Sequence, residues 1–234
     1  MADPGGGLVT VNKVDRNNLD RLATVGWLSE QPLDFQARVA AAGRWTTFAR
    51  GQVVYSEGDT ATAIYGLGEG LLDISIAISA EEQVVVYRAP RGFWIGHSAV
   101  LAGSTRTVSL TAAVESRVFR LSAVAVRRLL AERPADWIRF ALLSHRNLAL
   151  ALQGLAEVLA LPPRVRFARM LLRMASADGA VRVTQTELSR MAGMSRAAFR
   201  RALGDLIATG AIAVAYGDLR IVDRPALENA ARDR

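Results

Sequence analysis

The chain has 234 residues, of which 51% are hydrophobic and 22% are charged, a composition typical of a folded protein of one or two domains and unlike a disordered or collagen-like polymer. It contains no cysteine, which excludes disulfides, thiol catalysis, Cys-ligated zinc and iron–sulfur clusters. The longest stretch without Asp, Glu, Lys or Arg, Gly92–Thr105, is too short to cross a bilayer. Because the N-terminus lacks a basic segment followed by an apolar one, we expect no secretion signal and a cytoplasmic location.

Positive charge is concentrated in the last third of the chain. The formal net charge is +7, and Lys13 is the only lysine among the 29 basic residues. Residues 164–234 carry 13 Arg against 7 acidic residues, whereas residues 1–163 carry 16 basic and 15 acidic residues. A basic region joined to a nearly neutral one predicts a polyanion partner, although a solvated basic face without a partner would give the same count.

The first half of the chain changes from helical to strand-like patterning. Residues 1–17 are expected to form a flexible leader, and helical spacing of apolar residues predicts a helix over Asn18–Ala42. From Trp45 to Leu121, short β-branched runs alternate with turn residues, which predicts an all-β sandwich or barrel. The predicted strands are Val53–Tyr55, Ala63–Tyr65, Leu71–Ile78, Gln83–Tyr87, Thr107–Val114 and Val118–Leu121.

Helical spacing returns at Ala123–Leu130 and, after Pro134, continues to Leu161. Seven residues of the second segment follow alternating spacings of four and three, which is the a/d seam of a coiled coil. They are Ile138, Leu142, His145, Ala149, Leu152, Ala156 and Leu159. The flanking apolar residues are Leu143, Leu148, Leu150, Leu155 and Val158. The helix could use the seam to lie on its own sheet, but the apolar flanks favour packing of one face on the barrel and a parallel homodimer through the seam.

Two prolines separate this helix from the basic third of the chain. Pro162-Pro163 should end the helix and supply a hinge. An amphipathic helix is predicted over Arg164–Ala177. Near the end, Ala211–Val222 alternates around Gly217-Asp218, which predicts a hairpin with a two-residue loop.

Between these elements lies the pattern of a helix-turn-helix. Thr184 and Glu187 have the spacing of a capping box, so a helix should begin after Thr184. That helix ends at Gly193, and Ser195 caps the next helix after one intervening residue. Two short helices joined through a glycine predict a helix-turn-helix, and the hairpin that follows makes it a winged helix.

The second helix, Ser195–Ala208, carries the strongest candidate site. Its predicted buried stripe is Phe199, Leu203 and Leu206. Its opposite face carries Arg196, Ala197, Arg200 and Arg201 in the first two turns, where a recognition helix contacts base edges in the major groove.

Each polar candidate has a predicted contact on DNA. Arg can donate to both O6 and N7 of guanine, so Arg196 and Arg201 are candidate base contacts, and Arg200 could contact bases or phosphates. Hydroxyls at helix N-termini bind anions, so the candidate phosphate contacts are Ser195, Thr184 and Thr186. An Arg-rich surface helix without a ligand is the alternative, weakened by the joint presence of cap, glycine turn, buried stripe and wing.

These elements, in this order, resemble the cyclic-AMP receptor/fumarate-nitrate regulator (CRP/FNR) family. The matching pieces are Gly51–Asp59, Gly92–Gly96, Arg106-Thr107, the long helix before Arg164, and Val183–Ile212. The resemblance implies an α+β fold with a jelly-roll-like β-roll sensor domain of the cyclic-nucleotide-binding type at residues 18–133, a dimerisation helix at 134–161 and a winged-helix DNA-binding domain at 162–234. It also implies a homodimeric bacterial transcription regulator, not an enzyme, that binds a palindrome in double-stranded DNA and contacts RNA polymerase.

The same resemblance assigns an effector pocket. Cyclic-nucleotide binders of the family have a Glu that accepts from the ribose hydroxyl and, about ten residues later, an Arg that pairs with the phosphate. In this chain His97 takes the place of the Glu after Gly96, followed by Ser98, whereas Arg106 and Thr107 match. The pair that contacts the base in the family falls on Ala151 and Leu152 of the long helix.

These replacements bear on the effector. A pocket built for a hydroxyl loses selectivity when the acceptor is lost, because burial then leaves a polar group unpaired, so cyclic AMP is not expected to act in the usual way. Another nucleotide, another anion held by Arg106, or no effector remain open, and an ion pair with a carboxylate of the roll would also explain Arg106. On the recognition helix, Ala197 stands where many relatives have a Glu that reads cytosine, whereas Arg201 keeps the position that reads guanine.

Two functions of different classes follow. The first is a sequence-specific DNA-binding transcription regulator of the CRP/FNR type. The second is a small-molecule-binding sensor whose helix-turn-helix serves protein contacts. No catalytic or metal site is assigned, because the sequence has no His-x-x-x-His zinc pattern and no phosphate-binding P-loop. His145 is most simply a residue of the seam, with a pH sensor or a metal ligand as the alternative.

Overall fold

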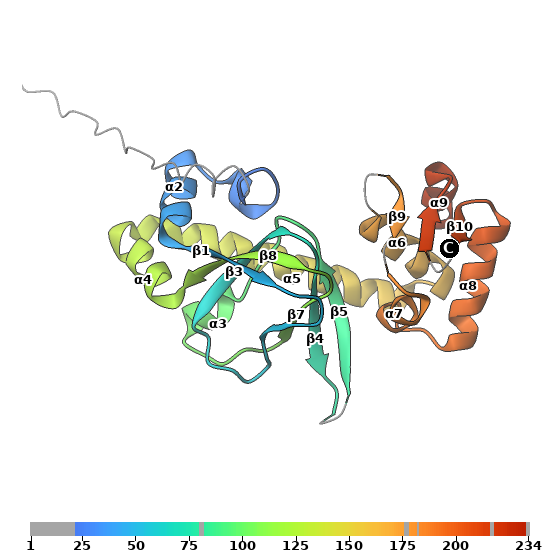
Figure 1. Ribbon diagram of the computed structural model, residues 1–234, viewed down its shortest axis with the longest axis horizontal. Helices are drawn as coiled ribbons and strands as arrows, with labels where there is room; N and C mark the ends of the chain where they lie inside the picture. The colour runs from blue at the N-terminus through green and yellow to red at the C-terminus, as the bar shows by residue number, and fades with distance from the viewer. Residues whose placement is uncertain (1–21, 80–81, 176–177, 182, 216–217, 233–234) are drawn as a thin grey trace, which may run out of the picture. The chain divides into compact units, whose positions relative to one another are not determined.

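The computed structural model describes residues 22–79, 82–175, 178–181, 183–215 and 218–232, without the side chains of residues 186, 215 and 218 (Figure 1). The predicted leader, residues 1–17, lies outside the described residues. Contacts between Cα atoms divide the chain into two compact units. The first comprises residues up to 73 together with 89–144, and the second comprises residues 74–88 together with 145–234.

The predicted continuous helix over Asn18–Ala42 is wrong in its described part. A 3₁₀ helix, η1 (Trp27–Glu30), follows Gly26, whose φ of 84° is outside the helical region, and α2 (Leu33–Ala42) begins only after Pro32. Pro32 adopts an extended conformation and has no N–H to donate, so it separates the two helices although the apolar spacing runs through it.

The β-roll is confirmed. Its strands are β1 (Arg44–Phe48), β2 (Val53–Tyr55), β3 (Ala63–Glu69), β4 (Leu72–Ala77), β5 (Gln83–Ala89), β6 (Trp94–Ile95), β7 (Ser109–Ala112) and β8 (Ser116–Ser122). One sheet has the order β1-β8-β3-β6 and the other the order β2-β7-β4-β5. In the first sheet, β8 pairs antiparallel with both β1 and β3, which places Phe119 beside Trp45 on one side and Gly66 on the other.

Two helices belong to the roll. Helix α4 (Ala123–Glu132) lies where the spacing predicts it, and the Ser122 hydroxyl caps it by accepting from the Ala125 N–H. Helix α3 (His97–Ala102) lies within the region predicted to be all-β. The apolar core of this unit contains Trp94, Phe119 and Phe140, each at most 1% exposed.

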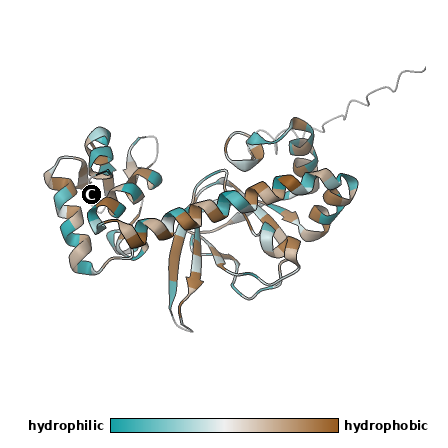
Figure 2. Ribbon diagram, turned by 180° about the vertical axis from the view of Figure 1, so that it is seen from behind, coloured by the Kyte–Doolittle hydropathy of each residue, from teal (hydrophilic) through white to brown (hydrophobic). Residues whose placement is uncertain are grey.

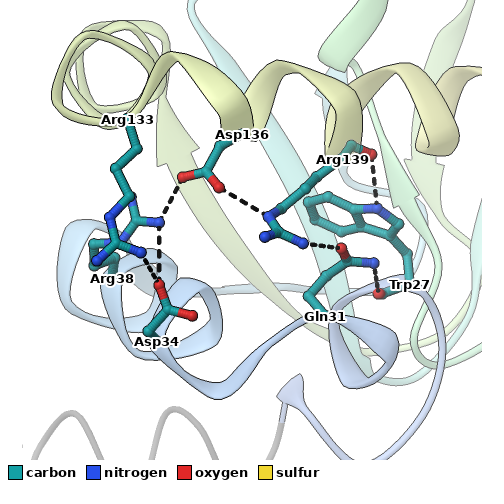
Figure 3. Close-up of polar contacts among 7 residues, drawn as sticks. All are labelled: Trp27, Gln31, Asp34, Arg38, Arg133, Asp136 and Arg139. Atoms are coloured by element: carbon teal, nitrogen blue, oxygen red, sulfur yellow. Dashed lines mark hydrogen bonds and ion pairs between the residues drawn. The ribbon is translucent and has the colours of Figure 1, made fainter.

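The long helix is joined to the N-terminal helices by a polar network (Figure 3). It begins as a 3₁₀ turn, η2 (Pro134–Asp136), and continues as α5 (Trp137–Ala160). The buried Asp136 carboxylate accepts from Arg38 at 2.5 Å and from Arg139 at 2.8 Å, and the Trp27 indole donates to the Arg139 carbonyl at 3.1 Å. Asp34 pairs with Arg133 and Arg38 at the exposed side of the network.

The last part of the chain is a winged helix, as predicted. Its elements are α6 (Pro163–Met174), β9 (Ala180–Val181), α7 (Gln185–Met191), α8 (Arg196–Ala208), β10 (Ile212–Ala215), β11 (Asp218–Ile221) and α9 (Arg224–Ala230). The sheet order is β10-β11-β9, and the Phe167 and Phe199 rings pack edge to face with centroids 5.1 Å apart in the core between α6 and α8.

The wing differs from the prediction at its loop. Asp218 pairs with Ala215 and therefore belongs to β11 instead of the turn. The two connecting residues are 216 and 217, so the predicted loop residue Gly217 lies outside the described residues. Helix α9, which no sequence pattern indicated, places Leu227 in the core.

Candidate nucleic-acid interface and sensor site

The two helices of the helix-turn-helix begin at side-chain caps. The capping box is present: the Glu187 N–H donates to the Thr184 hydroxyl at 3.2 Å, and the Thr184 N–H donates to the Glu187 carboxylate at 2.9 Å. The Ser195 hydroxyl accepts from the Ala198 N–H at 3.2 Å and begins α8. Gly193, with φ 58°, makes the turn between the helices, and such a backbone conformation favours glycine.

The recognition helix presents its predicted polar face to solvent. Phe199, Leu203 and Leu206 are at most 9% exposed, as the spacing predicts. The opposite face carries exposed Arg196, Ala197, Arg200 and Arg201. Among the described residues, no acidic side chain pairs with these three arginines, so their donors are available to a polyanion.

The hydroxyls predicted to contact phosphate are only partly placed. Ser195 and Thr184 are exposed at the starts of α8 and α7. The Thr184 hydroxyl also donates to the Glu187 carboxylate at 2.8 Å, which commits its proton within the cap. The side chain of Thr186 lies outside the described residues. Two exposed arginines that sequence reasoning did not select, Arg190 on α7 and Arg220 on β11, belong to the same domain.

The seam of α5 is exposed along its length. The side chains of Ile138, Leu142, Leu152 and Leu159 are between 54% and 77% exposed, and His145, Ala149 and Ala156 are exposed too. Figure 2 shows brown, hydrophobic residues recurring along the visible face of α5. Such a run of exposed apolar side chains on one helix is the feature that coiled-coil packing buries.

The apolar residues that flank the seam differ in exposure. Leu143, at 1% exposed, packs into the core of the roll unit beside Phe140. Leu148, Leu155 and Val158 are each more than half exposed, and Leu150 is half-buried. The first turns of α5 thus contribute Phe140 and Leu143 to the core of the first unit, and further along the helix exposed apolar side chains occur outside the seam as well as within it.

His97 is buried in the first unit. It is 3% exposed, and its Nε2 lies 2.9 Å from the Ser144 hydroxyl, which itself donates to the Phe140 carbonyl at 3.1 Å. Burial lowers the pKa of His97 to about 4, so the imidazole is neutral near pH 7. Because the Ser144 proton is directed at Phe140, His97 donates through Nε2 and its buried Nδ1 has no hydrogen-bond partner among the described residues.

Arg106 is enclosed by the roll. It is 3% exposed and donates from Nη1 to the Gly96 carbonyl at 2.9 Å and from Nη2 to the Ala63 carbonyl at 2.5 Å. Its guanidinium carbon lies 4.2 Å from the centroid of the Tyr55 ring and 5.6 Å from that of Tyr65. No described carboxylate pairs with it, so backbone carbonyls and aromatic faces stabilise this buried cation, whose Nε has no hydrogen-bond partner among the described residues.

Gly96 is required at its position for two reasons. Its φ is 88°, which side chains other than glycine rarely adopt, and a Cβ there would lie 2.5 Å from Arg106 Nη1. The structure therefore brings Gly96, His97 and Arg106 together in the first unit. Ser98 and Thr107 are exposed. Ala151 and Leu152 are exposed on the part of α5 that belongs to the second unit.

Two other kinds of site were sought among the residues that the structure describes. In this part of the chain, no group of three or more Asp, Glu or His side chains is placed to hold a metal ion. None of the described helices is both long enough and apolar enough to span a membrane.

Comparison with known proteins gives matches for both parts of the chain. Residues 45–133 match the family described as cyclic nucleotide-binding domain, and residues 165–230 match the Crp-like helix-turn-helix domain. The chain is 27% identical over 195 residues to a protein of Mycobacterium tuberculosis named CRP-like cAMP-activated global transcriptional regulator, covering 79% of this chain and 87% of that protein.

Solved structures share the fold. FixK2 from Bradyrhizobium japonicum superposes with a TM-score of 0.71 at 14% identity, covering 80% of this chain and 96% of FixK2. The c-di-GMP-responsive global regulator CLP of Xanthomonas campestris gives a TM-score of 0.64 at 20% identity, covering 80% of this chain and 97% of CLP.

The fold and these matches define the class of protein first: a β-roll of the cyclic-nucleotide-binding type followed by a Crp-like helix-turn-helix domain. The chain belongs to the CRP/FNR family of DNA-binding transcription regulators. Members of this family regulate transcription and are not enzymes.

Proposed function

We propose that this chain regulates transcription as a cytoplasmic homodimer that binds a palindromic DNA site and contacts RNA polymerase. The observation that carries the proposal is the face of α8, where Arg196, Arg200 and Arg201 are exposed and lack acidic partners among the described residues. In a two-fold dimer the two recognition helices would enter major grooves about 34 Å apart, which requires a palindrome.

Individual contacts follow from the chemistry of the side chains. Arg196 and Arg201 would read guanine through paired donors, and Arg200 would contact a base or a phosphate. Ser195 and Thr186 would contact phosphates near the helix N-termini, and Thr184 would do so by exchanging its hydrogen bond to Glu187 for one to a phosphate. Ala197 offers only a methyl group, so it would favour apolar contact with a thymine methyl over the cytosine contact of relatives with Glu.

The homodimer would form through α5. Its seam residues are exposed over the whole length of the helix, and pairing with a second copy would remove this apolar surface from water. A parallel pair places both winged helices at the same end of the dimer, as a palindrome requires.

We further propose that cyclic AMP does not control this protein in the usual way. His97 stands where the family has the acidic ribose contact, so a carboxylate is lacking there. The imidazole is neutral and hydrogen-bonded to Ser144. Ala151 and Leu152 have no side-chain hydrogen-bonding groups, and the Arg106 donors Nη1 and Nη2 are directed at backbone carbonyls. The M. tuberculosis relative is named cAMP-activated and the Xanthomonas structure c-di-GMP-responsive, so the fold serves more than one effector. Another nucleotide, another anion at Arg106 and no effector are the alternatives to test.

The DNA-binding proposal is tested by selecting duplexes from a random pool and titrating the enriched palindrome in fluorescence anisotropy. We expect a marked preference over random duplex and a log–log salt slope of about −0.9 per neutralised phosphate. Absence of any preference would favour the second candidate, a small-molecule sensor whose helix-turn-helix contacts protein.

The effector proposal is tested separately by calorimetry with cyclic AMP and cyclic-di-GMP. We expect no complex with cyclic AMP in the micromolar range, and such a complex would overturn the proposal. Heat from cyclic-di-GMP alone would support control by a different nucleotide.

A further inference from the structure

Helices α5 and α6 meet at a joint where proline interrupts the backbone hydrogen bonds of the helix. Helix α5 ends at Ala160, and α6 begins at Pro163 with Pro162 as its N-cap. Pro162 has no N–H, so the Val158 carbonyl lacks the donor that residue 162 would supply in a continuous helix. The Arg166 side chain, from the first turn of α6, donates to this carbonyl at 3.1 Å. A side chain of α6 therefore caps the C-terminal end of α5.

A buried carboxylate makes the second tie across the same joint. Glu157 is 6% exposed, and both of its oxygens accept from Arg173 Nη1 at 3.0 Å. Arg169 Nη1 lies 3.6 Å from Glu157 Oε1, and Arg169 Nε also donates to the Ala231 carbonyl just after α9 at 2.9 Å. All of these residues belong to the second compact unit.

The spacing of the arginines makes them one surface. Arg166, Arg169 and Arg173 are separated by three and four residues, so they lie on one face of α6 over successive turns. This face meets the last turn of α5 through Val158 and Glu157. We call these five residues the joint clamp.

Stability alone does not explain the acid in the joint clamp. A carboxylate near the C-terminus of a helix is repelled by the helix dipole, and its burial carries a further desolvation cost. A buried ion pair is often no more stabilising than apolar residues of the same volume, but it fixes geometry. Glu157 is both buried and close to the C-terminus of α5, and arginines of α6 compensate its charge.

The orientation of α6 determines that of the recognition helix. The Phe167 ring of α6 packs against the Phe199 ring of α8 at 5.1 Å, and both side chains are buried. A rotation at the joint would therefore carry α8 with it as a rigid body. Because a palindrome demands one separation between two recognition helices, freedom at the joint would weaken full-site binding without changing the contacts of one helix with one half-site.

We propose that Glu157 is a positioning residue for DNA binding, which holds α6 and the winged helix at one angle to α5 through Arg169 and Arg173. The inference rests on the proposed function. In this proposal the hinge predicted at Pro162-Pro163 is restrained: the prolines interrupt the helical hydrogen bonds, and the joint clamp sets the angle between the helices.

The test uses the full-length chain and the palindromic duplex that the wild type selects from a random pool. Variants of this duplex have one or two base pairs added to or removed from the spacer, and a further probe contains a single half-site. Glu157→Gln keeps the side-chain volume and removes the charge. Arg173→Gln breaks the same tie from an exposed position, where misfolding is not expected. Glu228→Gln is the matched control, because it removes a Glu–Arg pair that lies within α9.

We expect Glu157→Gln and Arg173→Gln to weaken binding to the selected duplex about tenfold, to bind the half-site within about twofold of the wild type, and to flatten the dependence of affinity on spacer length. The double variant should be no weaker than either single variant, because both remove one interaction. Glu228→Gln should match the wild type throughout.

Three results would count against the inference. Unchanged spacer dependence in both variants would overturn it, and an equal loss on the half-site and the full site would assign Glu157 to the stability of the domain instead. A wild type that selects no duplex would refute the proposed function itself, and the positioning role would fall with it.

Discussion

Replacing Arg106 separates a structural arginine from a ligand-binding one. In Arg106→Met, the Gly96 and Ala63 carbonyls lose donors in a site that is 3% exposed, and the Tyr55 ring loses the cation above it. Methionine fills much of the volume of the arginine stem, so the change removes polar interactions more than packing.

The expected magnitude is a balance of opposing terms. Two charge-assisted hydrogen bonds contribute about 1.5–3 kcal/mol each, and a desolvated cation–π contact about 2 kcal/mol. Removing a buried cation recovers several kcal/mol of desolvation cost, so we expect a net loss of about 2–4 kcal/mol in the free energy of unfolding.

Urea unfolding followed by tryptophan fluorescence measures this loss at a fixed protein concentration. Arg117→Met is the control, because Arg117 also covers an aromatic ring, that of Trp45, but is more exposed, and it should cost about 0.5–1 kcal/mol. A structural role for Arg106 is refuted if Arg106→Met unfolds at the same urea concentration as the wild type while losing a cyclic nucleotide that the wild type binds.

Other perturbations test the remaining parts of the molecule. Asp136→Asn should cost about 2–4 kcal/mol in urea unfolding, because Arg38 and Arg139 share this carboxylate, whereas Glu132→Gln, at an exposed pair, should cost little. Although burial raises it, hydrogen bonds from Arg139 and Arg38 hold the pKa of Asp136 below its ordinary value. The wild type should therefore lose this stability as pH falls from about 4 through the folded-state pKa, and equal acid sensitivity in Asp136→Asn would contradict the assignment. Arg201→Ala should weaken binding to the selected duplex by about 1–3 kcal/mol and relax preference at one base pair, as read by binding to singly substituted duplexes; unchanged preference would remove the base contact. Leu142→Asp should convert the dimer to a monomer in light scattering while Leu33→Asp, at an exposed leucine of α2, does not; an intact Leu142→Asp dimer would exclude the seam.

Sequence patterns predicted the elements in which one face repeats over several turns. The seam of α5 and the stripe of Phe199, Leu203 and Leu206 recur at helical spacing, so the sequence alone indicates which side of each helix is exposed. The break at Pro32 was missed because apolar spacing continues through it, and α3 because six residues are too few to show a period.

Partners made by backbone atoms could not be predicted in the same way. Sequence reasoning assigned Arg106 a phosphate or a carboxylate, whereas its partners are two carbonyls and two rings, and carbonyls occur at every residue. The charge of residues 164–234 had the same limitation. Arg166, Arg169 and Arg173 belong to that basic segment but are directed at α5 and α9, so only part of the excess charge can face a polyanion.

The contact between Gly96 and Arg106 also restricts which substitutions evolution can accept at these two positions. Any side chain at residue 96 would require an unfavourable backbone conformation. Its Cβ would lie 2.5 Å from Arg106 Nη1, so the guanidinium would have to move. A smaller residue at 106 would relieve that collision but remove the hydrogen bonds that Arg106 donates to the Gly96 and Ala63 carbonyls. A substitution at Gly96 is therefore opposed by the backbone conformation and by Arg106, and replacing Arg106 as well would relieve only the collision. In a library of random variants, Gly96 and Arg106 should be among the least tolerant positions of the roll, whether or not any small molecule binds beside them.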